Sequence, residues 1–158
     1  PEYNQKWNNY YMQDPRVRLL NRCNTHKELS DIMRSVSCGF FPSRAEGWNL
    51  ELLEMMSCGK PVVTTDYSAH TEFCTDENSY KVKPKSLEKA FDGMYFREED
   101  KGNWASLKGI ENDLVEALRE VYEQWKKDGD VVNKEGIKTA QNMSWAVTAN
   151  KVKEAINA

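Results

Sequence analysis

The stretch P-S-R-A-E-G-W-N-L-E-L-L-E-M-M-S-C-G-K-P, residues 42–61, is the part of this sequence around which its elements are predicted to be arranged. It begins as a loop that carries Glu46 and Gly47 and continues into a helix that carries Glu54. Asn49 stands at the N-cap position of that helix, and the glycine and proline that follow predict its end. One carboxylate is therefore expected in the loop and the other on the second turn, where a polar ligand lying across the helix start could contact both.

Apolar runs on both sides of this stretch predict a parallel sheet. Residues 38–42 and 61–65 are apolar without alternation, as in strands buried on both faces. Upstream, Thr25 with Glu28 at the capping-box spacing predicts a helix that runs to about Val36. Strands that alternate with helices indicate β-α-β units. The predicted fold is therefore a Rossmann-like α/β domain with flanking helices.

The rest of the chain is predicted to be mostly helical after residue 82, with a helical C-terminal region over 109–158. Residues 84–106 are interpreted as an irregular excursion with aromatic anchors. The other expected elements are a helix over 2–13, strands over 16–20 and 80–82, a short helix over 69–73, and helices over 110–127, 131–142 and 145–156, the last capped by Ser144.

Composition narrows the class of protein. A chain of 158 residues fits one domain, and 22 basic against 25 acidic side chains leave a net charge of −3, which excludes an extended nucleic-acid surface. No apolar run approaches the ~20 residues that cross a bilayer. The first residue is proline, so a piece of a longer protein is expected. The four cysteines lie far apart in sequence and predict reduced core thiols of a cytoplasmic protein, without a metal site: Cys23, Cys38, Cys58 and Cys74.

The start of the central helix has the chemistry of an anion site. A helix N-terminus carries unpaired N–H groups and partial positive charge, so it can bind phosphate without a basic side chain. Gly47 would let the backbone approach closely, and Glu54 could accept hydrogen bonds from a ribose diol. Glu46, just past a strand end, could hold sugar hydroxyls, because open parallel sheets bind ligands there. The residues alone leave an alternative open, in which both glutamates are solvated surface acids and Gly47 is a turn residue.

Several short motifs in this region resemble, in order and spacing, the carboxy-terminal domain of retaining GT-B glycosyltransferases, above all glycosyltransferase family 4. They are F-F-P-S at 40–43, E-G-W-N-L at 46–50, L-L-E at 52–54 and G-K-P-V-V at 59–63. A weaker resemblance extends over 17–82 and returns in N-M-S-W at 142–145. The two glutamates match the paired-glutamate motif of the family.

The resemblance implies that residues 1–158 are the nucleotide-sugar donor domain of a GT-B enzyme, truncated at its N-terminus. Such an enzyme transfers a hexosyl group from a donor such as a UDP- or GDP-sugar, with retention of configuration and without a metal. Glu46 would be the catalytic residue, with its carboxylate contacting the donor sugar on the face where the bond breaks, and Glu54 would hold the ribose. The other donor-binding residues would be Ser43, Arg44, Gly47, Trp48, Asn49 and Leu50. For Arg44, a solvated loop position is an equal alternative.

The sequence also departs from the family pattern. Asn49 stands where the family usually has glycine, and Met55-Met56-Ser57 replaces alanine-methionine-alanine. The arginine and lysine that grip the diphosphate in the family, and the domain that binds a glycan, lipid or other acceptor, lie outside this sequence. We therefore expect the fragment alone to be inactive, and the protein to be cytoplasmic or peripheral at a membrane through the absent domain.

Family topology has a further implication for the sheet. Two strands that lie between the strand at 16–20 and the strand at 38–42 would precede this sequence. They would have to come from another chain or another segment, unless the sheet is rearranged.

Two alternatives to this function remain open. A sugar phosphorylase or a sucrose or trehalose synthase shares the motif, and a non-catalytic nucleotide-binding module could retain the pocket.

Other candidate residues are weaker. We interpret His26 and His70 as turn or surface residues, Glu72 as a surface acid, and Trp104 and Trp125 as packing residues instead of sugar platforms.

Overall fold

The computed structural model describes residues 14–93, 95–97 and 101–157. The helix expected over 2–13 lies outside the described residues. The elements are α2 (His26–Ser35), β1 (Gly39–Phe41), α3 (Leu50–Ser57), β2 (Val62–Thr65), the 3-10 helix η1 (Ala69–Glu72), β3 (Tyr80–Val82), β4 (Leu87–Lys89), β5 (Asn103–Ala105), α4 (Glu111–Asp128), α5 (Lys134–Asn142) and α6 (Trp145–Ile156).

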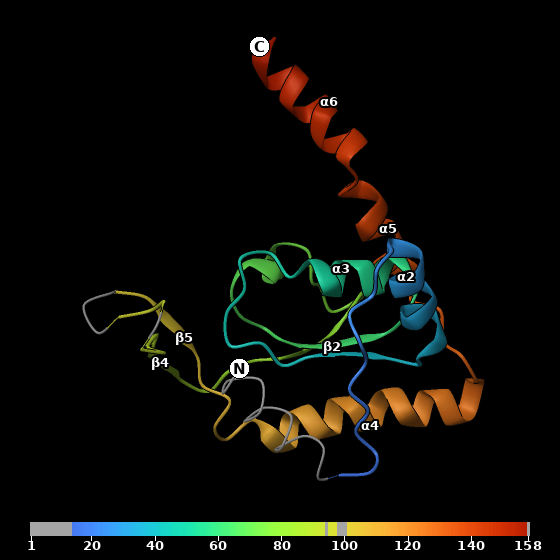
Figure 1. The fold of residues 1–158 in the computed structure, drawn as a ribbon, viewed down its shortest axis with the longest axis vertical. Helices are drawn as coiled ribbons and strands as arrows, with labels where there is room; N and C mark the ends of the chain where they lie inside the picture. Colours follow the sequence, from blue (N-terminus) through green and yellow to red (C-terminus); the bar gives the residue numbers. More distant parts are fainter. Residues whose placement is uncertain (1–13, 94, 98–100, 158) are drawn as a thin grey trace.

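A parallel sheet of order β1-β2-β3 lies at the centre of the molecule. Phe40 is in register with Val63, and Thr64 with Lys81. Helices α2 and α3 lie on one side of the sheet and α4 on the other (Figure 1). This arrangement confirms the predicted α/β fold with flanking helices.

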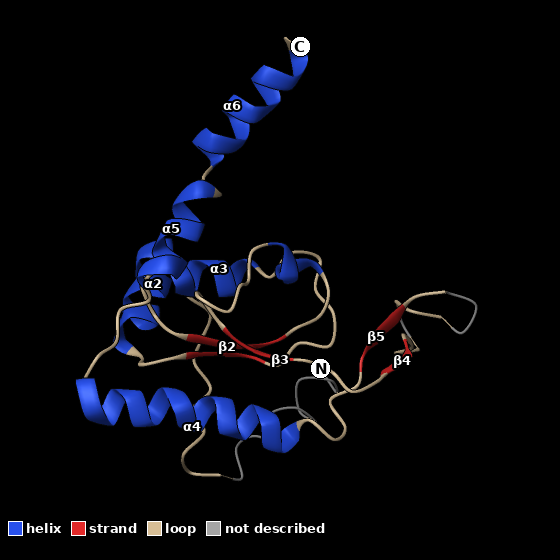
Figure 2. Ribbon diagram, turned by 180° about the vertical axis from the view of Figure 1, so that it is seen from behind, coloured by secondary structure: helices blue, strands red, loops and turns tan. Residues whose placement is uncertain are grey.

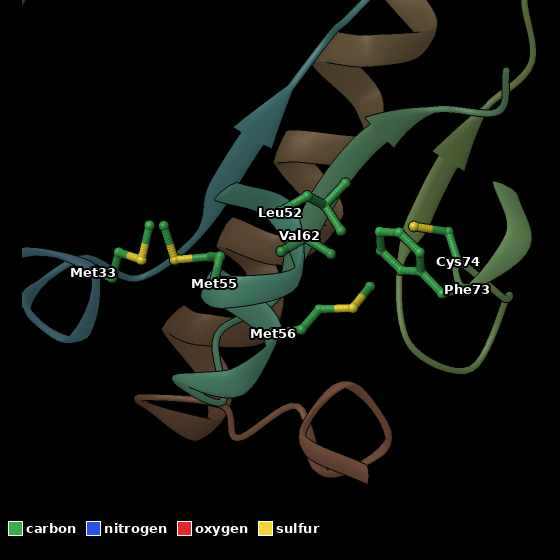
Figure 3. Close-up of a cluster of buried hydrophobic side chains, with 7 residues drawn as sticks. All are labelled: Met33, Leu52, Met55, Met56, Val62, Phe73 and Cys74. Atoms are coloured by element: carbon green, nitrogen blue, oxygen red, sulfur yellow. The ribbon is translucent and has the colours of Figure 1, made fainter. Parts of the chain in front are cut away.

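Two apolar clusters fill the spaces between these layers. Val62 belongs to the cluster with α3 and Val63 to the cluster with α4, because neighbouring strand residues point to opposite faces. The whole of β2 is therefore buried, as the apolar run predicted. Figure 3 shows the first cluster, which contains Met33, Leu52, Met55, Met56, Val62, Phe73 and Cys74. The second contains Val63, Val82, Ile110, Leu114, Ala117 and Val121.

The C-terminal end of α3 is closed by a glycine turn and by α5. Gly59 has φ +73°, and its N–H donates to Met56 O at 2.9 Å, while Lys60 N–H donates to Met55 O at 3.2 Å. These two bonds form a Schellman motif, which satisfies carbonyl groups that the helix leaves free. Asn133, the N-cap of α5, donates its backbone N–H to Gly59 O at 2.8 Å. The end of α3 and the start of α5 are thus joined directly.

Two predicted strands differ from the structure. Residues 16–20 form no strand, because no described strand lies beside them, and Val17 and Leu20 are exposed. β1 is a strand, but it is not buried on both faces, since Phe40 is 45% exposed. Gly39 faces Met55 of α3, so Phe40 points to the opposite face, where α4 packs mainly on β2 and β3. β1 is thus an edge strand of the described sheet, with Phe40 exposed on one face.

The segment predicted to be irregular contains a β-hairpin. β4 and β5 pair antiparallel, with Glu88 opposite Trp104. The hairpin projects from one end of the body, and α6 projects from the opposite end (Figures 1 and 2). Ser144 caps α6 as predicted, whereas α5 begins at Lys134, three residues after its predicted start. Among the described residues, no helix is long and apolar enough to span a membrane.

Candidate functional site

The N-terminus of α3 is built on a residue in a strained backbone conformation. Asn49 has φ 69° and ψ 64°, in the left-handed region that non-glycine residues rarely adopt. Its side-chain Oδ1 accepts a hydrogen bond from Leu52 N–H at 3.3 Å and so caps the helix, as predicted. Asn49 is only 5% exposed, and its Nδ2 is buried without a partner among the described residues. A buried unpaired donor is costly, so this amide is a candidate for a ligand contact.

A serine ties together the loops that follow β1 and β2. Ser68 Oγ lies 2.7 Å from Glu46 N, from which it accepts, and 3.2 Å from Glu46 O, to which it donates. Ser68 itself has φ 71°. Both loops lie at the carboxyl ends of parallel strands, where open α/β sheets bind their ligands. Glu46 is therefore held at this edge through its backbone, and its carboxylate is left free to point elsewhere.

Beneath these loops lies a buried polar network. Thr65 Oγ1 donates to Ser43 O at 2.6 Å, and Thr64 Oγ1 donates to Phe41 O at 3.1 Å. His70 Nε2 lies 2.6 Å from Thr65 O, which can only accept, so Nε2 carries the proton of this bond. The network fixes the ends of β1 and β2 relative to each other.

His70 is the one histidine whose predicted position is wrong. It is fully buried, with 0% exposure, and is not a turn or surface residue. Two consecutive threonines at the end of a buried strand could have indicated that a polar side chain such as His70 is buried beside them, because buried hydroxyl groups need hydrogen-bond partners. His26 is exposed at the start of α2, as expected.

The two glutamates and the glycine between them remain accessible. Glu46 and Glu54 are half-buried, and neither carboxylate makes a hydrogen bond or ion pair with a described residue. Gly47 is exposed, and a Cβ atom built on it would meet nothing within 4 Å. Trp48 is 38% exposed and packs its ring 5.3 Å from that of Phe73. A polar ligand could reach this loop without displacing an internal partner.

Arg44 has a different environment from the one expected. Its Nη2 pairs with Glu88 Oε1 of the hairpin at 2.6 Å, and the guanidinium carbon lies 4.1 Å from the centre of the Trp104 ring. Arg44 Nε also donates to Ala105 O at 3.3 Å. The side chain therefore contacts the hairpin in this structure. Sequence reasoning missed these partners because Glu88, Trp104 and Ala105 lie in the segment that was interpreted as irregular.

The remaining candidates take no part in this arrangement. Glu72 is an exposed acid on η1, and Trp104 is a packing residue, as predicted. Trp125 stacks on Tyr122 at a centroid distance of 5.9 Å at the surface of α4. The part of the chain that the structure describes contains no group of three or more side chains that could hold a metal ion.

The cysteines offer no activated thiol at this edge. All four are free, with Cys74 buried and the other three half-buried. Burial raises the pKa of Cys38 and of Cys74 to about 11. Both therefore remain protonated at neutral pH, and nucleophilic chemistry needs the thiolate.

Comparison with known proteins identifies related families and folds. The glycosyl transferases group 1 family matches residues 1–95, which is more than half of the chain. No curated protein matches the sequence. The chain is similar in structure to the C-terminal domain of a glycosyl transferase group 1 family protein (LpcC) from Francisella tularensis, with a TM-score of 0.59 and 17% identity over 90% of this chain and 62% of that chain. It is also similar to sucrose-phosphate synthase from Thermosynechococcus elongatus, with a TM-score of 0.61 and 16% identity over 99% of this chain and 33% of that chain. The chain thus spans less than two thirds of either structure.

Proposed function

The chain belongs to the group 1 glycosyl transferases, and we propose that the N-terminus of α3 binds the nucleotide-sugar donor for a retaining sugar transfer. The observation that supports this most is the combination at Asn49 of a free helix N-terminus and a buried, unpartnered Nδ2. Glu46 precedes Asn49 in the sequence and Glu54 follows it, and neither carboxylate has a partner within the described residues.

The diphosphate would lie against the backbone amides of residues 47–50. A helix N-terminus supplies N–H donors and partial positive charge, and Gly47 leaves open space where any side chain would intrude on the ligand. Ser43, Trp48 and Leu50 would border the donor at the same position. Arg44 belongs to this loop as well, but its guanidinium group is held by the hairpin.

The two glutamates would contact the two sugars of the donor. Glu54, one turn into the helix, would accept hydrogen bonds from both hydroxyls of the nucleotide ribose. Glu46, in the loop just past β1, would contact the transferred sugar, for which a hexosyl group carried by UDP or GDP is the proposed class. An ionised carboxylate accepts hydrogen bonds on two oxygens, so each acid can hold a pair of adjacent hydroxyls.

The reaction would use the same groups. Breaking the bond between the sugar and the diphosphate leaves additional negative charge on the leaving group. The amides at the start of α3 would lie at the position of that charge, so they would stabilise it without reorganising. The remaining positive charge and the acceptor would be supplied by parts of the protein beyond residues 1–158, and we expect this chain alone to transfer no sugar.

Glu54→Gln tests the donor site. In the full-length protein, calorimetry with UDP- and GDP-sugars should show binding weakened about tenfold or more, because hydrogen bonds to a charged carboxylate are among the stronger ones. Glu51→Gln is the matched control, since Glu51 is an exposed acid in the first turn of the same helix.

Unchanged affinity in Glu54→Gln would contradict the proposed site. Tighter binding of sugar phosphates than of nucleotide sugars would favour phosphorylase chemistry. Donor binding with no transfer to any acceptor would favour a non-catalytic module.

We further propose that the open edge of β1 pairs with strands from another segment or chain. Phe40 is exposed there, and an apolar hollow of about 330 Å³ lies between the start of β1 and α4, bordered by Cys38, Tyr122 and Trp125. An exposed apolar strand edge is a template for pairing. Sedimentation and thermal melting of residues 1–158 test this: self-association or a non-cooperative melt is expected, whereas a monodisperse monomer that melts cooperatively would contradict it.

A further inference from the structure

Arg44 lies where the donor-site loop meets the β4–β5 hairpin, and it contacts both strands of that hairpin. Glu88 belongs to β4 and Trp104 to β5, and the two residues are directly opposite each other in the antiparallel register. The guanidinium group pairs with the first and lies over the ring of the second. One side chain of the loop therefore spans the full width of the hairpin.

Backbone contacts strengthen the same junction. Ala105 N–H donates to Arg44 O at 2.7 Å, while Arg44 Nε donates back to Ala105 O at 3.3 Å. The loop after β2 adds a second attachment, because Tyr67 OH donates to Asn103 O at 3.0 Å. The hairpin is thus fastened to the loop that follows β1 and to the loop that follows β2.

The chemistry of the junction suits arginine and no other residue. A planar guanidinium group can stack on an indole ring and, in the same position, hydrogen-bond in its own plane to a carboxylate and a carbonyl. Glu88 and Arg44 are each 38% exposed in their side chains, so the ion pair alone would be weak. The stacking and the backbone bonds make the arrangement a defined one, and they set the position of the chain between Ser43 and Glu46.

We propose that Arg44 is a positioning residue, which fastens the loop carrying Ser43 and Glu46 to the β4–β5 hairpin so that the donor meets a preorganised loop. This inference rests on the proposed donor site and names a part of the molecule, the hairpin, that controls it. Arg44 then acts on donor binding through the loop and not through a contact with the diphosphate.

The two possible roles of Arg44 predict opposite results for Glu88→Gln. If Arg44 positions the loop, removing the charge of Glu88 loosens the junction and raises the KM for the donor, in the same direction as Arg44→Met. If Arg44 instead binds the diphosphate, Glu88→Gln frees the guanidinium group and leaves the KM unchanged or lowers it. Glu123→Gln is the matched control, because it removes an exposed ion pair, with Lys126, on α4.

The experiment compares these variants in the full-length protein by donor KM, kcat and hydrogen exchange. We expect Arg44→Met and Glu88→Gln each to raise the KM about threefold to tenfold, with a smaller change in kcat, and the double variant to be no worse than Arg44→Met alone. Arg44→Lys should raise the KM less than Arg44→Met but should not reach the wild-type value, since an ammonium group cannot stack as a plane. A Glu88→Gln variant with unchanged or lower KM, or with an effect that adds to that of Arg44→Met, would overturn the proposal.

Hydrogen exchange separates this inference from the proposed function. Amides in residues 43–47 and 103–106 should exchange several times faster in Arg44→Met and Glu88→Gln than in the wild type or in Glu123→Gln, without any donor present. Unchanged exchange there would overturn the positioning role even if donor binding is confirmed. Faster exchange in these two variants, together with a wild-type protein that binds no nucleotide sugar, would support the positioning role and refute the donor site instead.

Discussion

Asn49 and Gly59 flank α3 at its two ends, which have opposite characters. At the C-terminal end, Met55 and Met56 are buried, and Gly59 closes the helix against α5. At the N-terminal end, Gly47 and Leu50 are exposed, and Asn49 keeps a buried donor without a partner among the described residues. At the C-terminal end the backbone groups of the helix are hydrogen-bonded within the protein, whereas at the N-terminal end polar groups are left without a partner among the described residues.

We infer from this difference that the C-terminal end of α3 contributes mainly to stability and the N-terminal end mainly to donor binding. Substitutions at the C-terminal end should change the free energy of unfolding and leave the intrinsic affinity for the donor intact. Substitutions at the N-terminal end should change donor affinity with little effect on stability, unless they alter the cap. Variants at the two ends should therefore differ in which of the two quantities they change.

The largest effect is expected for Met56→Ala. Met56 is fully buried in the cluster between α3 and the sheet, so its truncation should lower the free energy of unfolding by about 2–5 kcal/mol. Denaturant titration measures the loss, and calorimetry well below the melting temperature should find donor affinity unchanged. Leu50→Ala is the control for stability, since Leu50 is 60% exposed and its truncation should cost less than about 0.5 kcal/mol.

Gly59→Ala should also destabilise the C-terminal end, though less. A side chain at φ +73° costs roughly 1–2 kcal/mol, and the new Cβ would lie only 3.2 Å from Ile137 Cδ1 of α5. Thermal melting should show the loss, and hydrogen exchange should place it in α5. A variant as stable as the wild type would refute the view that this turn holds α3 and α5 together.

Asn49 is the counterpart of Gly59 at the other end, because it has nearly the same φ. Asn49→Ala loses the cap bond while keeping the strain, and should cost about 1–2 kcal/mol. Asn49→Gly relieves the strain and should stay within about 0.5 kcal/mol of the wild type. Denaturant titration of the pair measures both. Equal losses in the two variants would show that the left-handed conformation is not what selects asparagine here.

The smallest effect on stability, with a clear effect on binding, is expected for Gly47→Ala. A methyl group there meets no protein atom within 4 Å, so the free energy of unfolding should change by less than about 0.5 kcal/mol. The same methyl group would occupy space proposed for the diphosphate, so calorimetry should show weaker donor binding. Full donor affinity in this variant would argue that the ligand does not approach the backbone at this position.

The sequence predicted the ends of α3 well because both are encoded locally. An asparagine cap and a glycine–lysine–proline turn fix where the helix starts and stops, and the full burial of β2 followed from its apolar run. The hairpin could not be predicted in this way. Its strands have three residues each, and Arg44 reaches Ala105 across 61 positions of sequence, so the pairing depends on contacts that no local pattern records.

The same limit explains the position of His70 and the missing strand at 16–20. The burial of His70 depends on acceptors at Thr64 and Thr65 that become neighbours only when the loop folds back. Residues 16–20 have a strand-like composition, but an extended segment becomes a strand only when another strand pairs with it. For the donor site, local sequence patterns predicted the candidate residues around α3. The partners of Arg44 are distant in sequence and could be identified only in the folded structure.

Hydrogen exchange of the full-length protein with and without a saturating nucleotide sugar can show whether the donor binds at the N-terminus of α3. We expect slower exchange of amides in residues 46–53 on donor binding, with no change in residues 55–60, where the helix end is already closed. Protection confined to another part of the chain, such as the cleft bordered by residues 76–80 and 131–135, or no protection at all in this chain, would contradict the assignment of the donor to the N-terminus of α3.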